Sequence, residues 1–139
     1  MTELGDFLEQ MEEEEKQRQW AFPCAHIGKE MDEISDFITN GDIEGRYSAL
    51  LVFEEAYVNV LKYAYPGKEE KPILVTVRVT KSNIEMVIVD AGIPFDPTKY
   101  VFKKNVDDIG EHGVEIIVKY SKKVKYKRVC NLNILQVIV

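Results

Sequence analysis

The 139-residue sequence has little cysteine and no long apolar run, and each absence excludes a class of protein. Its two cysteines, Cys24 and Cys130, form neither a disulfide framework nor the spacing of a metal site. A reduced, cytoplasmic compartment is therefore the expectation. No apolar stretch approaches the roughly 20 residues that cross a membrane, and the acidic first residues lack the features of a signal peptide. We therefore expect no membrane association.

The sequence also lacks an excess of positive charge. It has 18 lysines and arginines against 24 acidic residues, a formal charge of −6. General nucleic-acid binding depends on cationic neutralisation of phosphates, so direct nucleic-acid binding is not expected. The lysines between residues 119 and 128 are more typical of a solvated face. The length and the 45% hydrophobic content predict one domain over residues 1–139 with a substantial core. Residues 1–18 form an acidic leader, predicted as a short amphipathic or frayed helix.

Periodicity and turn residues predict the order of elements along the chain. Adjacent strands joined by tight turns imply antiparallel pairing, and helices on one face of such a sheet make a two-layer α/β sandwich of the α+β class. The predicted strands are 19–26, 72–80, 84–89, 122–129 and 132–139, and the predicted helices are 27–40, 43–65 and 113–120. Residues 93–113 show no clear period, and a loop of this length is usually functional, for example as a lid.

The stretch Leu50–Tyr65 is apolar on nearly every side at helical spacing, which is typical of a buried helix. Glu55 and Asn59 interrupt it four residues apart, so their side chains lie on one face. One interpretation is an interhelical hydrogen-bond pair or a cap. The other is chemical: amide and carboxylate oxygens are hard ligands suited to Mg²⁺ beside a phosphate, and a carboxylate can accept a proton from an attacking hydroxyl.

Two further groups contain glycine beside a polar residue. Asp90 ends an apolar strand and is followed by Gly92, so its carboxylate could accept a hydrogen bond from the amine of a purine whose flat ring the glycine admits. An ordinary β-turn has the same appearance. Gly110 and Gly113 precede a helix, whose N-terminal N–H groups favour phosphate, although two glycines before a helix are weak evidence alone.

The order and spacing of these groups resemble the GHKL ATP-binding family of histidine kinases, gyrase-type ATPases and bacterial anti-sigma serine kinases. Three stretches are similar to the N, G1 and G2 boxes of that family: Glu55-Ala56-x-x-Asn59-x-x-x-Tyr63-Ala64-Tyr65, Asp90-x-Gly92-x-Pro94-Phe95-Asp96-Pro97, and Gly110-Glu111-His112-Gly113-Val114-Glu115-Ile116-Ile117. The end of the chain, through Val124-x-Tyr126 and Asn133-x-Leu135, resembles the family's last two strands. The resemblance covers about residues 20–139 and implies a GHKL, or Bergerat, fold with a mixed, mainly antiparallel sheet.

The resemblance also implies a role for each matching residue. Asn59 would hold Mg²⁺ against the phosphates of ATP, and Glu55 would be the catalytic base. The other nucleotide-binding positions would be Asp90 at the adenine amine with Gly92 and Phe95 in the same motif, and Gly110, His112, Gly113 and Val114 in the G2 motif. Residues 97–112 would form the lid over ATP, with His112 at the variable position of its motif. The implied partners are a sigma factor and an anti-anti-sigma antagonist that accepts the phosphoryl group, with the kinase as a homodimer.

Glu111 stands where the family has glycine, in the loop expected to approach the phosphates. We weigh three hypotheses for the function. A carboxylate about 4 Å from a phosphate charge is repelled by about 1 kcal/mol in water, and by more where water is excluded. The first hypothesis is an anti-sigma factor with ATP-dependent serine kinase activity. The second is the same fold acting by sequestration, with weak or absent phosphoryl transfer. The third, a catalytic fragment of a sensor histidine kinase, is less favoured because the chain leaves no room for a phosphoacceptor helix pair.

Overall fold

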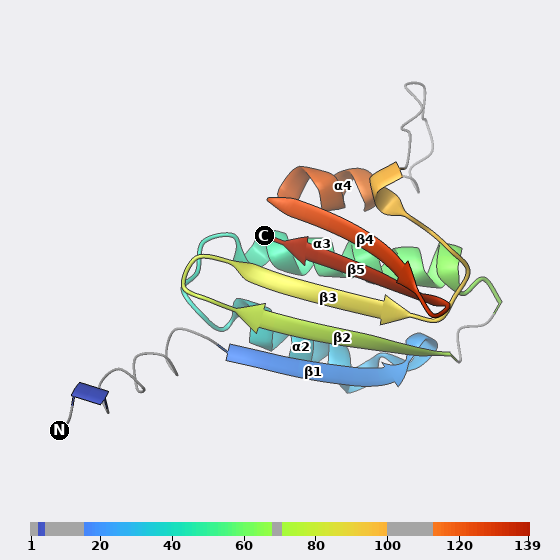
Figure 1. Cartoon of the computed structure of the whole chain (residues 1–139). Helices are drawn as coiled ribbons and strands as arrows, with labels where there is room; N and C mark the ends of the chain where they lie inside the picture. Colours follow the sequence, from blue (N-terminus) through green and yellow to red (C-terminus); the bar gives the residue numbers. More distant parts are fainter. Residues whose placement is uncertain (1–2, 5–15, 68–70, 100–112) are drawn as a thin grey trace.

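The computed structural model describes residues 3–4, 16–67, 71–99 and 113–139 (Figure 1). The helices and strands follow one another along these residues in the order that the sequence predicts. The strands are β1 (Lys16–Pro23), β2 (Pro72–Val79), β3 (Ile84–Asp90), β4 (Lys123–Val129) and β5 (Leu132–Ile138), and the α-helices are α2 (Gly28–Thr39), α3 (Arg46–Asn59) and α4 (Gly113–Tyr120). Short helical turns follow β1, α3 and the loop after β3, at Cys24–His26, Val60–Ala64 and Pro97–Lys99.

The five strands form one sheet in the order β1-β2-β3-β5-β4. Each neighbouring pair is antiparallel. The last strand in sequence, β5, lies between β3 and β4, so the chain crosses from β3 to the outer edge through α4 before it returns (Figure 1). This arrangement confirms the predicted two-layer α+β fold with a mainly antiparallel sheet.

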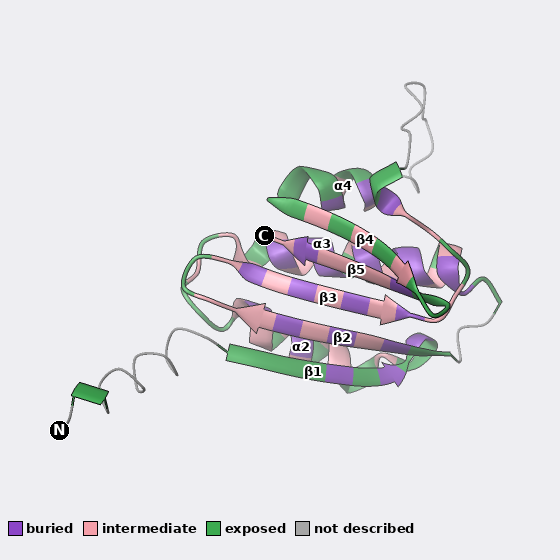
Figure 2. Ribbon diagram, in the orientation of Figure 1, coloured by how far each residue is buried: buried purple, intermediate pink, exposed green. Residues whose placement is uncertain are grey.

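The helices lie together on one face of the sheet and the core fills the space between the layers (Figure 1). Side chains alternate along the central strands: Ile73, Val75 and Val77 of β2 are buried, while the residues between them are half-buried. Figure 2 shows this alternation as stripes across β2 and β3. Because successive strand residues point to opposite faces, the buried set faces the helices and the other set forms the open face.

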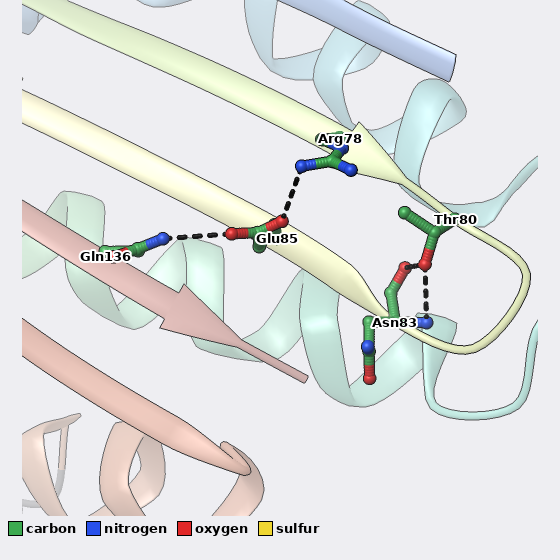
Figure 3. A network of polar contacts seen from close by, with 5 residues as sticks. All are labelled: Arg78, Thr80, Asn83, Glu85 and Gln136. Carbon is green, nitrogen blue, oxygen red and sulfur yellow. Dashed lines mark hydrogen bonds and ion pairs between the residues drawn. The ribbon is translucent and has the colours of Figure 1, made fainter. Parts of the chain in front are cut away.

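Polar contacts cross the open face from strand to strand. Arg78 of β2 donates to Glu85 of β3 at 3.3 Å, and Gln136 of β5 donates to the other oxygen of Glu85 at 2.9 Å (Figure 3). At the end of β2 the Thr80 and Asn83 backbones and the Thr80 hydroxyl close the predicted hairpin turn. The open face is therefore tied together by side chains as well as by the backbone ladder.

The first strand differs from the prediction. It covers Lys16–Pro23 instead of 19–26, so residues 16–18, expected in the leader, pair with Val79–Val77 instead. The polar start of β1 carries no hydrophobic signal, and backbone pairing with β2 holds it in the strand. The strand ends at Pro23 because proline has no N–H for the ladder, and Cys24 begins a turn, donating from its own N–H to Lys71 at 2.9 Å. Pro23 thus lies at the end of an edge strand.

The long central helix also differs at both ends. It was predicted over 43–65, whereas α3 covers Arg46–Asn59 and is followed by one π-helical turn, Val60–Ala64. Gly45 precedes the helix at φ +86°, a conformation that glycine adopts without strain. The π-turn begins at the residue after Asn59, and such turns occur often at functional sites.

Three predictions lie wholly or mostly outside the described residues. These are the leader helix, the lid over 97–112 beyond the short turn at Pro97–Lys99, and the phosphate loop before Gly113. Neither Cys24, which is buried, nor Cys130, which is exposed, forms a disulfide. Within the described ranges, no helix has the length and apolar character needed to cross a bilayer.

Candidate active site

The buried helix α3 presents Glu55 and Asn59 toward the start of α4. Asn59 is only 8% exposed, and Glu55, one turn earlier, is half-buried. The Asn59 Nδ2 atom is buried without a hydrogen-bond partner among the described residues. Such an atom is costly to bury unless something fills its hydrogen bond. An interhelical hydrogen bond made by Asn59, one interpretation of the sequence, does not account for this unpartnered Nδ2 atom.

Gly113 explains how close α3 and α4 come at this point. A Cβ built on Gly113 would lie 2.7 Å from Glu55 Oε2 and 3.3 Å from Asn59 Oδ1. Only glycine leaves that space free without moving the two side chains. The structure therefore brings Glu55, Asn59 and Gly113 together at the N-terminus of α4, whose free N–H groups favour an anion.

Asp90 lies at the end of β3, where the chain turns away from the sheet. Its Oδ1 accepts from the Gly92 N–H at 2.9 Å and from Asn133 Nδ2 at 2.8 Å. Both of these contacts involve Oδ1, and none among the described residues involves Oδ2. Asp90 is only 6% exposed, and burial raises the pKa of its carboxyl group above the ordinary value of 3.8, against the lowering effects of these hydrogen bonds and of Arg128.

Backbone contacts fix the turn that follows Asp90. The Ala91 N–H donates to the hydroxyl of Tyr65 at 2.6 Å, and that hydroxyl donates to the Pro72 carbonyl at 2.8 Å. The Ile93 N–H donates to the Ala64 carbonyl at 3.0 Å. A Cβ on Gly92 would lie 2.2 Å from the same Ala64 oxygen, so only glycine fits there. The π-turn after α3 and the turn after β3 are thus bound directly to each other.

The C-terminal hairpin supports Asp90 from the other side. Asn133 Nδ2 donates to the Ile93 carbonyl at 2.8 Å as well as to Asp90. Arg128 Nη1 donates to Asn133 Oδ1 at 2.8 Å and to the Gly92 carbonyl at 3.0 Å, and the Tyr126 hydroxyl also donates to Asn133 Oδ1. Asp90 is therefore held by residues from two strands more than 35 positions further along the chain.

A cavity of about 30 Å³ lies between α3, the end of β3 and the hairpin. It is lined by Ala56, Asn59, Val60, Ala64, Ile88, Asp90, Phe95, Pro97, Tyr126 and Leu135. Phe95 stacks on Tyr63 of the π-turn, with ring centroids 4.7 Å apart and planes at 15°. The space suits one or two waters, so a purine ring enters only if some of the lining side chains move.

The structure separates the predicted site residues into groups. Asn59, Asp90 and Phe95 line the cavity, and Glu55 and Gly113 lie close to Asn59. Gly92 and Val114 have packing positions, Gly92 against Ala64 and Val114 buried in α4. Gly110, Glu111 and His112 lie outside the described residues.

Four residues at the site were not assigned roles from the sequence: Tyr65, Tyr126, Arg128 and Asn133. Tyr126, Arg128 and Asn133 lie on the helix-facing side of β4 and β5. In β4 every second residue faces the helices, so Arg128 follows Val124 and Tyr126 on that side. A charged residue on the inward face of a strand was the available signal, because such a residue needs a buried partner.

Comparison with known proteins identifies the family. Residues 25–139 match the model of the histidine kinase-like ATPase domain, and the chain belongs to this family. A "Serine/threonine-protein kinase BtrW" of Bordetella bronchiseptica (strain ATCC BAA-588 / NCTC 13252 / RB50) is 26% identical over an 88-residue alignment that covers 60% of this chain. The match covers 62% of that protein's length. The chain therefore carries a kinase-like ATPase domain of the GHKL type, as the sequence motifs predicted.

The residues present fit ATP and Mg²⁺. The unpartnered Asn59 amide, the Gly113 space and the one-sided contacts of Asp90 each leave room for a ligand atom. The described residues contain no cluster of three or more acidic, histidine or cysteine side chains that could hold a metal ion alone. A cation here would thus depend on the Asn59 oxygen together with phosphate oxygens, the coordination that Mg²⁺ commonly takes with nucleotides.

Proposed function

We propose that this protein is an ATP-dependent serine kinase that phosphorylates an anti-anti-sigma antagonist and also binds a sigma factor, acting as an anti-sigma factor. The observation that carries the kinase part is the placement of Glu55 and the buried, unpartnered Asn59 amide at the N-terminus of α4, with Asp90 across the cavity. The serine/threonine kinase named among its relatives supports the reaction. The partners, a homodimeric state and a cytoplasmic location rest on the resemblance of the sequence motifs alone.

The residues divide the work of phosphoryl transfer between them. Asp90 Oδ2 accepts the adenine amine and so fixes the position of the nucleotide. Asn59 would hold Mg²⁺, which would supply positive charge against the phosphoryl oxygens when bound. The N–H groups at the start of α4 donate to phosphate oxygens. Glu55 orients the serine hydroxyl in line with the γ-phosphorus and takes its proton as the new oxygen–phosphorus bond forms, while the bond from the γ-phosphorus to the β–γ bridging oxygen breaks and ADP leaves.

A second candidate is sequestration of a partner without phosphoryl transfer. It is favoured by Glu111, whose charge lies in the motif expected to approach the phosphates. The two candidates share the fold and differ only in the fate of the γ-phosphate.

The deciding experiment incubates the protein with Mg-ATP labelled at the γ-phosphate and an anti-anti-sigma antagonist. We expect acid-stable phosphoserine on the antagonist. Glu55→Gln should bind ATP with unchanged affinity and transfer no label, which separates the proton acceptor from a binding residue. An unlabelled antagonist in the presence of bound ATP would favour sequestration, and acid-labile label on the protein's own histidine would favour a histidine kinase.

A further inference from the structure

The C-terminal hairpin contains a chain of hydrogen bonds that ends on the nucleotide-facing carboxylate. It runs from Arg128 of β4 to Asn133 of β5 and then to Asp90 of β3, with distances of 2.8 Å at both steps. We propose that Arg128 and Asn133 are positioning residues that make Asp90 selective for a base with an exocyclic amino group. This inference rests on the proposed nucleotide site.

The amide of Asn133 has its orientation specified at both ends. The Arg128 guanidinium can only donate, so the atom that it contacts is the amide oxygen. The Ile93 carbonyl can only accept, so the atom that faces it and Asp90 is the amide nitrogen. All four hydrogen-bonding positions of the amide are filled once Tyr126 is included.

This orientation determines which oxygen of Asp90 is available. Oδ1 receives two donors, Asn133 Nδ2 and the Gly92 N–H, and has no further role toward a ligand. Oδ2 is left as an acceptor on a carboxylate held by these contacts, and Asp90 lines the cavity. A base with an amino group completes it, whereas a base without one leaves a buried carboxylate oxygen unpaired. Sites built this way reject the analogue that lacks the donor.

Arg128 contributes through a second contact to the same turn, because it donates to the Gly92 carbonyl at 3.0 Å. Its place on the inward face of an edge strand is explained by these two contacts. Arg78, by comparison, lies on the open face and is paired with Glu85. Arg78, on the opposite face of the sheet, therefore provides the control substitution for Arg128.

The test compares the affinities of Mg-ATP and of the magnesium complex of purine riboside triphosphate, which lacks only the amino group. Calorimetry on the wild-type protein should favour ATP by about 10- to 150-fold, the effect of one hydrogen bond to a charged group. Asn133→Leu and Arg128→Met should each reduce that preference to about threefold or less. The first leaves Asp90 with only the Gly92 N–H donor, and the second leaves Asn133 less firmly held, so Oδ2 is no longer presented at a fixed place. Arg78→Met should keep the wild-type preference.

A double variant shows whether Arg128 acts through Asn133. In the Asn133→Leu background, Arg128→Met should not change the preference further, since the path is already interrupted. Additive losses would overturn the proposal and indicate that Arg128 only supports the backbone. A wild-type preference in both single variants would also overturn it while leaving the ATP site intact. Absence of ATP binding by the wild-type protein would overturn the proposed function and this inference together.

A ligand-free measurement addresses the same chain of contacts. Both Asn133 side-chain amide protons are hydrogen-bonded, so nitrogen-15 NMR should show them slow to exchange in the wild-type protein. Arg128→Met should speed their exchange, and Arg78→Met should not. Equal exchange in Arg128→Met would show that Arg128 does not hold the amide.

Discussion

At the scale of single residues, the site depends on groups that the fold leaves incompletely satisfied. Asp90 is buried with one oxygen saturated, and Asn59 is buried with an unpartnered nitrogen. Natural proteins keep such groups where a ligand supplies the missing partner. Asp90 and Asn59 therefore reduce stability slightly while they prepare a binding site.

The raised pKa of Asp90 predicts a pH effect on stability and on binding. The pKa of Asp90 is higher in the folded state than in the unfolded state. The free energy of unfolding therefore falls as the pH rises from 3.8 through the folded-state pKa, because the folded state holds the proton more tightly. At a pH above that range, Asp90→Asn, which has no such proton to lose, should unfold at an equal or higher urea concentration than the wild-type protein.

Binding should have the opposite pH dependence. The ionised carboxylate accepts the amine, so adenosine affinity should fall as pH is lowered toward 3.8 through the raised pKa. Adenosine avoids the titration of the phosphates. Asp90→Asn should bind weakly with no such pH dependence, and a pH-dependent loss in that variant would assign the titration to another group.

The two close-packed glycines predict contrasting outcomes. In Gly113→Ala the new Cβ meets the flexible end of Glu55 at 2.7 Å, so the fold should survive within about 1 kcal/mol. Phosphoryl transfer should fall at least tenfold, because Glu55 is displaced. In Gly92→Ala the Cβ meets a backbone oxygen at 2.2 Å, so unfolding should be easier by about 1–3 kcal/mol. Gly41→Ala, with no atom closer than 4.0 Å, is the control for both measurements.

At the scale of elements, the turn after β3 is held by the π-turn after α3. Tyr65 is fully buried and connects the Ala91 N–H to the Pro72 carbonyl. The unusual winding of Val60–Ala64 places this tyrosine under the Asp90 turn and places Tyr63 against Phe95. The helix end therefore works as the support of the site.

Tyr65→Phe should test that support. Removing the hydroxyl leaves two polar backbone groups unpaired, so urea unfolding should show a loss of about 1–3 kcal/mol. ATP affinity should also fall, since the turn carrying Asp90 is less constrained. Tyr47→Phe is the control because Tyr47 is 67% exposed. Wild-type stability in Tyr65→Phe would show that water replaces the hydroxyl.

The sequence predicted these elements unequally. The helix at 113–120 and the hairpin strands follow strong periodicity and clear turns, so their bounds agree with the structure to within one residue. The polar start of β1 was missed because its place comes from pairing with β2. The π-turn was missed because its apolar residues continue a helical pattern, and only the tertiary contact of Ala64 with Gly92 and Ile93 distinguishes it.

At the scale of the whole molecule, the sheet order brings distant residues to one point. Because β5 lies between β3 and β4, Asn133 lies opposite Asp90 and Arg128 lies opposite Asn133. Local patterns predicted the two layers, but they do not specify which strand enters the middle of a sheet. The motif residues Glu55, Asn59 and Asp90 were therefore predictable, whereas their supporting contacts required the topology.

The most direct test of the central claim is calorimetric titration of the whole protein with Mg-ATP, for the wild type and Asp90→Asn. The account predicts saturable one-site binding by the wild type and a loss of about 10- to 150-fold in the variant. Both proteins should unfold at similar urea concentrations, so the loss is one of recognition. Equal affinity in the two proteins, or no binding by a folded wild type, would contradict the assignment of this cavity as a nucleotide site.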